Sequence, residues 1–323
     1  MTLLEAVAIY VERKRSEGCF YGKSEKDLLS LSNHVGKSSL NRVTARQIAS
    51  FLDGPKTSPF TWEKKYGLLR SFFDYWLARG EIDALPLPAK RRTSHRAFIP
   101  YIYTHSEIRA LIKATRTSQR RRFCRIDART LRTLFIFLYG TGTLVGEAKR
   151  LQVEDVDLKK GLLTIRAHHH NRPRTIPIGP DLKKILGEYL ESRLRQGPSA
   201  GHFFTNKTGE SLNVSTLSAT FLRVRRQSEV ERCDGARYQP RMHDLRHTFA
   251  VHRITGWIRH RADLNRMLPA LAAYMGQAGI GSTERYLSLT PERFRTQLDK
   301  LSPMRRKKRW RDDKALMKFL AEL

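Results

Sequence analysis

The sequence of 323 residues is poor in cysteine and has no long apolar run. Its three cysteines, Cys19, Cys124 and Cys233, are odd in number and widely spaced. This pattern excludes a disulfide framework and the paired spacing of a zinc site, and it favours a reducing cytosol.

The longest purely apolar stretch runs only from Leu134 to Tyr139, far short of the ~20 residues that span a bilayer. Glu5 interrupts the apolar N-terminus, which predicts a helix and not a signal peptide. We therefore expect a cytoplasmic protein without a membrane partner.

Acidic residues are scarce relative to basic ones. Asp and Glu number 31 against 61 Lys and Arg, which gives a formal net charge of +30. Such an excess attracts polyanions over a long range, and DNA or RNA is the usual partner. The basic residues gather in three clusters: Lys90, Arg91, Arg92 and Arg96; Arg120, Arg121, Arg122 and Arg125; and Arg305 to Arg309. One such cluster is typical of a solvated surface, and a ribosomal protein or a binder of anionic membranes has a similar charge. Three clusters together favour nucleic acid.

The pattern of apolar residues predicts a mainly α fold with a small β-hairpin. Helical spacing covers residues 2–16, 44–52, 59–78, 104–111, 127–140, 181–194, 215–226, 243–257 and 264–274. Thr44, Ser58 and Asp127 are predicted N-caps, and Thr104 to Glu107 form a predicted capping box. Two short runs rich in β-branched residues, 162–165 and 175–178, predict the hairpin.

A break in this periodicity predicts two domains. The segment from Ile82 to Pro100 holds three prolines and a run of positive charge, which is typical of an extended connector. We expect a helical N-terminal domain over residues 1–85, a basic linker over 86–99 and a larger domain with the hairpin over 100–302. A basic tail with a short amphipathic helix follows over 303–323.

One predicted helical face carries residues suited to phosphoryl chemistry. His243, Arg246 and His247 are spaced i, i+3 and i+4. An arginine can bind a phosphate bidentately, and an imidazole can accept or give a proton near neutral pH. His243 and His247 also have the spacing of a helical zinc site. However, Asp244 stands where a metalloprotease has its glutamate, and no third ligand is evident.

Three ordered motifs resemble those of the tyrosine recombinase, or phage integrase, family. They are GTGTLVGE at 140–147, HDLRHTFA at 243–250, and the turn Met275-Gly276-Gln277 followed nine residues later by Tyr286. A tyrosine after a glycine-rich turn is by itself typical of ordinary packing. The family, however, has His-x-x-Arg in this form, a Leu-Gly-His turn, and its nucleophilic tyrosine nine residues after that histidine. The resemblance runs from about residue 98 to 294, and the N-terminal helices match the family's core-binding domain only in type.

The resemblance implies a core-binding and a catalytic domain that clamp double-stranded DNA and exchange its strands without a cofactor or metal. Tyr286 would be the nucleophile, and Arg246 and His243 would assist it. We expect DNA contacts from basic residues of the linker, of the second cluster and of the hairpin: Lys90, Arg91, Arg92, Arg96, Arg121, Arg122, Arg172 and Arg174.

The sequence departs from the family at three positions. Leu144 stands at the first arginine, and losing such a donor costs on the order of 10²–10³ in rate. The basic residues 149–150 lie more than one helical turn away and do not replace it. The family's lysine falls on His169, or on His168 with a different gap; either imidazole can protonate a leaving oxygen, although a solvated turn explains the histidine run equally well. Gln277 replaces the second histidine and retains an N–H donor.

Two functions remain open from the sequence. The first is a recombinase or integrase of a mobile element, slowed or dependent on partner subunits. The second is a family member that binds its DNA site and assembles the synapse without cleaving. For assembly we expect a homotetramer on paired sites or a hetero-assembly with related recombinases. The helix at 314–323 would dock on a neighbouring protomer or fold back on its own domain.

Overall fold

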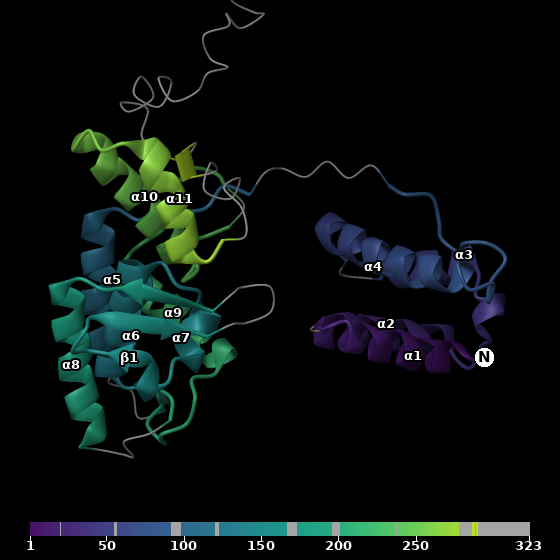
Figure 1. Cartoon of the computed structure of the whole chain (residues 1–323), viewed down its shortest axis with the longest axis horizontal. Helices are drawn as coiled ribbons and strands as arrows, with labels where there is room; N and C mark the ends of the chain where they lie inside the picture. Colours follow the sequence, from purple (N-terminus) through teal and green to yellow (C-terminus); the bar gives the residue numbers. More distant parts are fainter. Residues whose placement is uncertain are drawn as a thin grey trace, which may run out of the picture. The chain divides into compact units, whose positions relative to one another are not determined.

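The structure, a computed structural model, describes residues 1–19, 21–54, 57–91, 98–119, 123–166, 173–195, 201–236, 238–277, 286–287 and 289. It forms two compact units, Met1–Phe98 and Ile99–Leu323 (Figure 1). The chain passes from one to the other within the segment that the sequence analysis predicts as a linker. No helix in the described ranges is long and apolar enough to cross a membrane.

The first unit is entirely helical in its described part. Its elements are α1 (Leu3–Ser16), α2 (Gly22–Val35), the 3₁₀ turn η1 (Leu40–Arg42), α3 (Ala45–Leu52) and α4 (Pro59–Leu77). The core between them is rich in aromatic rings, such as the edge-to-face pair of Tyr10 and Phe72 with centroids 5.3 Å apart. The predicted N-caps are confirmed, because Thr44 accepts from the N–H of Gln47 and Ser58 accepts from the N–H of Thr61.

The second unit packs helices around α6 and carries a small sheet. Its elements are α5 (His105–Ser118), α6 (Ala128–Thr141), α7 (Val145–Arg150), η2 (Val153–Asp155), β1 (Val156–Asp157), β2 (Leu162–Ile165), β3 (Arg174–Pro177), α8 (Pro180–Leu194), α9 (Val214–Gln227), α10 (Asp244–Arg259) and α11 (Leu264–Met275). The predicted capping box at Thr104 and Glu107 and the N-cap Asp127 are both present. Helix α10 packs against α6 and α11 (Figure 1), so residues at the start of α10 meet the ends of both neighbours.

The sheet is antiparallel in the order β1-β2-β3. The predicted hairpin is confirmed, with Leu163 opposite Ile176 and Ile165 opposite Arg174. Because strand side chains alternate between faces, Arg174 shares the face of Ile176, which is 1% exposed. The sheet therefore directs Arg174 toward the interior of the unit.

Candidate functional site

The site is built around Arg246, the third residue of α10. Only 7% of this residue is exposed. Its Nη1 donates to the carbonyl of Gly142 at 2.6 Å, and its Nη2 donates to the carbonyl of Met275 at 2.9 Å. Gly142 is the C-cap of α6 and Met275 is the last residue of α11, so one guanidinium joins three helix ends. Burial lowers the pKa of Arg246, while Tyr286 and Glu147 raise it; the side chain stays charged at neutral pH.

Tyr286 lies close enough to influence that guanidinium. It is 4% exposed and belongs to a cluster of buried apolar side chains that includes Phe249. The Nε2 of Gln277 donates to the Tyr286 hydroxyl at 3.2 Å, and the His247 ring lies 5.6 Å from the Tyr286 ring, centroid to centroid. The structure thus brings Arg246 of the second sequence motif together with Gln277 and Tyr286 of the third.

The two histidines of the motif follow one another along the start of α10. His243 is the exposed residue just before the helix, and His247 is partly buried, with ring centroids 5.1 Å apart. Burial lowers the pKa of His247 to about 4; desolvation and the charges of Arg246 and Arg241 lower the pKa of His243. Both imidazoles are therefore neutral at pH 7 and able to accept a proton. Within the described ranges, no group of three or more His, Cys, Asp or Glu side chains could hold a metal ion.

Leu144 lies at the edge of this site as the N-cap of α7. Its backbone N–H donates to Oε2 of Glu147 at 2.9 Å, which is the capping arrangement that helix starts favour. Its side chain is a half-buried hydrocarbon and cannot donate to a phosphate. Glu147 itself is buried, with 4% of the residue exposed.

Arg174 occupies the space next to Glu147. Its Nη1 and Nη2 donate to the two carboxylate oxygens of Glu147 at 2.8 and 3.0 Å, and its Nε donates to the carbonyl of Tyr274 at 2.9 Å. Burial raises the pKa of the Glu147 carboxyl, but hydrogen bonds from Arg174 and from the Leu144 N–H bring it below its usual value. The sequence analysis places Arg174 among the DNA contacts of the hairpin. The structure places it inside the site, with its side chain 10% exposed.

Residues 102–293 match the model of the phage integrase family, which is more than half of the chain. The chain belongs to the phage integrase family. Two Sinorhizobium fredii proteins that carry integrase/recombinase names are similar in sequence. One, y4rB, is 27% identical over 96% of this chain and 99% of its own length; the other, y4rE, is 30% identical over 88% and 91%. In fold, the chain is similar to lambda integrase from a tetramer bound to a Holliday junction, with a TM-score of 0.65 at 18% identity over 88% of this chain and 77% of that one. Family membership confirms the expected fold class and supports a role in site-specific DNA recombination.

Sequence reasoning missed the Arg174–Glu147 pair of this chain. One signal was available: Glu147 follows Leu144 by three residues, which is the spacing of a capping box. A second signal was the alternation of the strand, because Arg174 precedes the apolar Ile176 by two residues. Neither signal reveals that the two side chains meet across 27 positions of sequence.

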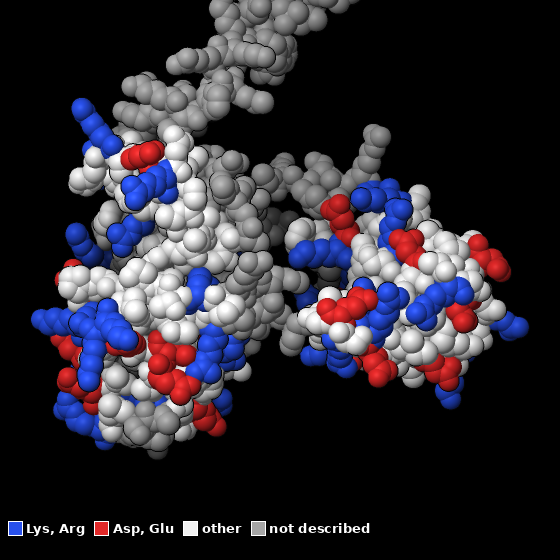
Figure 2. All heavy atoms as spheres, in the orientation of Figure 1, with Lys and Arg blue, Asp and Glu red and all other residues white. Residues whose placement is uncertain are grey.

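Two of the predicted DNA contacts in the first unit lie at its surface. Lys90 and Arg91 are exposed. Arg91 pairs with Asp53 at 2.7 Å and lies over the ring of Trp62, 5.2 Å from its centroid. Six other residues predicted for DNA contact or catalysis lie outside the described residues: Arg92, Arg96, Arg121, Arg122, Arg172 and His169. The alternative His168 lies outside them as well. On the face drawn in Figure 2, Lys and Arg side chains lie on both units and alternate with Asp and Glu.

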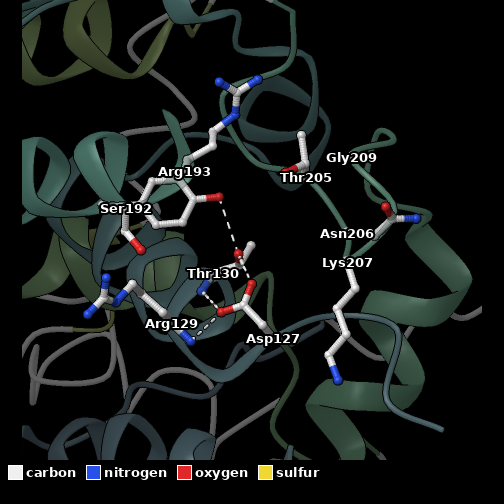
Figure 3. Close-up of a pocket in the computed structure, with 10 residues that line it drawn as sticks. Asp127, Arg129, Thr130, Ser192, Arg193, Thr205, Asn206, Lys207 and Gly209 are labelled. Atoms are coloured by element: carbon white, nitrogen blue, oxygen red, sulfur yellow. Dashed lines mark hydrogen bonds between the residues drawn. The ribbon is translucent and has the colours of Figure 1, made fainter. Parts of the chain in front are cut away.

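A separate cavity of about 410 Å³ lies at the opposite end of α6 (Figure 3). Its polar wall includes Asp127, which accepts from the backbone N–H groups of Arg129 and Thr130 at 2.7 and 2.9 Å. The site around Gly142 lies at the other end of this 14-residue helix, about 20 Å away at 1.5 Å per residue. The cavity contains none of the predicted site residues, and its Asp127 serves as a helix cap.

Proposed function

We propose that this protein is a site-specific DNA recombinase that cleaves and rejoins DNA through a covalent bond to Tyr286. The observation that carries the proposal is the hydrogen bond of Gln277 to the Tyr286 hydroxyl, with Arg246 near enough to that tyrosine for Tyr286 to raise its pKa. A buried, fully charged guanidinium beside a tyrosine hydroxyl is suited to bind a phosphate that the tyrosine attacks. Membership of the phage integrase family supports the same activity.

Cleavage in this proposal is a transesterification. The Tyr286 oxygen bonds to phosphorus, the bond to the 5′ oxygen breaks, and a 3′-phosphotyrosyl link forms. The phenol proton passes to a neutral imidazole, for which His243 and His247 are both available. The 5′ oxygen takes up a proton and leaves as a hydroxyl; His169 remains the prediction for this donor. Arg246 stabilises the negative charge that grows on the non-bridging oxygens, and attack by a 5′-hydroxyl reverses the step.

The proposal is tested with a nicked duplex. A target is first selected from random-sequence DNA by its affinity for the full-length protein, and a nick is then placed at successive positions. Cleavage next to a nick releases a short oligonucleotide and traps the protein on DNA, so wild type should give an adduct that survives denaturation. Tyr286→Phe should give none, whereas Tyr139→Phe, which removes a hydroxyl that contacts His252, should retain it. The proposal fails if wild type gives no adduct or if Tyr286→Phe gives as much.

Leu144 favours a second candidate function, a DNA-binding subunit that assembles recombination complexes without cleaving. A leucine at this position leaves one fewer donor for the phosphate. This function predicts tight, sequence-selective binding of the selected duplex and no adduct at any nick position. That result would establish the second function in place of the first.

We also propose that the protein acts on a mobile element as a homotetramer on paired sites. The integrase names of the two Sinorhizobium fredii relatives support the element, and the tetrameric state of lambda integrase on a Holliday junction supports the assembly. Sedimentation of the protein with a duplex carrying two selected sites should show four protomers per DNA. Removal of residues 314–323 should reduce the assembly if this predicted helix docks on a neighbour. One protomer per site at saturation would contradict the tetramer, and a larger assembly with a related recombinase would indicate hetero-assembly.

A further inference from the structure

We infer that Arg174, on strand β3, supplies to the scissile phosphate the positive charge that Leu144 cannot supply. The inference rests on the proposed function, because it places Arg174 in the site of Tyr286. It concerns a residue for which the sequence analysis expects no more than a general DNA contact.

The position follows from one short turn that contacts Arg174, Arg246 and Tyr286. The carbonyl of Tyr274 accepts from Arg174, and the carbonyl of Met275 accepts from Arg246. A Cβ added to Gly276 would lie 2.5 Å from Nη1 of Arg174, so the guanidinium rests directly on this glycine. The next residue, Gln277, donates to the Tyr286 hydroxyl. Arg174 and Arg246 therefore flank the segment that ends at the partner of the nucleophile, and the charge of Arg174 lowers the pKa of Arg246.

Arg174 also retains donors for a ligand. The described part of the chain provides acceptors for three of its five N–H groups, two on Glu147 and one on Tyr274. One N–H on each terminal nitrogen remains; the two lie on opposite edges of the planar guanidinium, so either can donate to a phosphate oxygen while Glu147 stays bound. The Arg174 side chain is 10% exposed, so it is not fully enclosed by the protein.

The net charge of the site also supports a phosphate contact by Arg174. Arg174, Arg246 and Glu147 together carry a formal charge of +1, and the neutral His243 and His247 add nothing at pH 7. A phosphodiester carries one negative charge, opposite to the net charge of these three side chains. Arg150 also lies within electrostatic range of Glu147, whereas Arg241 and Asp244 pair with each other. Without Arg174, the charges of Arg246 and Glu147 would cancel, and the attraction of these three side chains for the phosphate would be lost. A second guanidinium thus restores the electrostatic match that the leucine at 144 removes.

The first test measures the rate of adduct formation on the nicked duplex. We expect Arg174→Gln to slow it about 10²-fold or more, the usual effect of losing such a donor. The matched control is Arg166→Gln, which removes an arginine at the end of the other hairpin strand that pairs with Asp155 at 2.9 Å and should change the rate little. In the Arg174→Gln background, Leu144→Arg should recover much of the rate, and it should do less in wild type. A Tyr286-dependent adduct that forms equally fast with Arg174→Gln would overturn this inference and leave the proposed function standing.

A purely structural role for Arg174 has a different signature. If it only neutralises Glu147, the double variant Glu147→Gln with Arg174→Gln should regain the wild-type rate, because no unpaired buried charge remains. If its charge acts on the phosphate, the double variant stays slow. Recovery in the double variant would overturn the inference.

Binding tests Arg174 independently of cleavage. The probes are selected duplexes in which one phosphate at a time is replaced by a neutral methylphosphonate, and the protein background is Tyr286→Phe. At one position the replacement should weaken binding about tenfold with Arg174 present, the effect of one charged contact, and much less with Arg174→Gln. A scan that shows no position with this dependence would overturn the inference even if wild type never forms an adduct.

Discussion

Replacing Gly142 with alanine should destabilise the second unit more than an ordinary glycine substitution. Gly142 has a φ of +62° as the C-cap of α6, a conformation that costs an L-residue about 1–2 kcal/mol. An added Cβ would also lie 2.9 Å from Cε1 of Phe249 and closer still to its Cδ1. Phe249 is 5% exposed and stacks on Tyr274 with centroids 5.8 Å apart, so it has little room to move. Overpacking of this kind costs about 1–3 kcal/mol, which gives about 2–5 kcal/mol in total.

The control is Gly209→Ala in the same unit. Gly209 has a φ of +82°, and nothing lies within 4 Å of its added Cβ. It should therefore cost only the conformational term of about 1–2 kcal/mol. The difference between the two variants isolates the contact with Phe249.

Hydrogen exchange followed by mass spectrometry measures both variants in the full-length chain. The slowest amides of α6 report the free energy of opening the second unit, and those of α4 in the first unit serve as an internal reference. Gly142→Ala should also slow adduct formation, because the Gly142 carbonyl holds Nη1 of Arg246. If Gly142→Ala costs no more than Gly209→Ala, the reasoning about Phe249 is wrong.

Three further substitutions are informative. Arg246→Lys should slow adduct formation about 10²-fold or more, because an ammonium cannot bind two carbonyls and a phosphate in fork geometry. Equal single-turnover rates of the variant and wild type would contradict this prediction. The stability of the second unit, measured by hydrogen exchange, should fall as pH drops from 6.5 toward 4, because burial lowers the pKa of both His247 and His252 to about 4 and the unfolded chain takes up these protons first. His252→Phe should reduce this dependence and leave the contribution of His247; an unchanged slope would exclude His252 as a source. Thr248→Val should lower the free energy of opening the second unit by about 1–3 kcal/mol in the same measurement. The substitution removes Thr248 Oγ1, which accepts from the buried N–H of Tyr103 at 3.0 Å. A change near zero would show that this N–H finds another partner.

The long helices were predictable because their ends carry local signals. Thr44, Ser58, Thr104 and Asp127 each bond to a backbone N–H within three residues, so a few neighbouring letters determine where a helix begins. Helix α2 was missed because its N-cap, Tyr21, makes no side-chain cap bond and only three of its residues are buried. Helix α7 and strand β1 have six and two residues, too few for a periodic pattern to emerge.

Only those residues of the candidate site that lie in the spaced family motifs could be predicted from the sequence. The spacing of the family motifs brought Arg246, Gln277 and Tyr286 into one hypothesis, and the structure places them together. The pairing of Arg174 with Glu147 depends instead on the register of β2 and β3, in which Arg174 lies opposite Ile165. A slip of one residue would turn Arg174 to the other face of the sheet, and no local sequence signal determines that register.

Glu147 explains how a leucine can stand at position 144 beside an intact carboxylate. The Glu147 carboxylate accepts from the backbone of residue 144 and not from its side chain, so the cap of α7 survives the substitution. The same carboxylate then holds the guanidinium of Arg174 through both oxygens. Electrostatic stabilisation depends on where a charge lies and not on which element supports it. A second arginine that reaches Glu147 from β3 therefore meets the same requirement as one that starts α7, provided that its donors reach the phosphate.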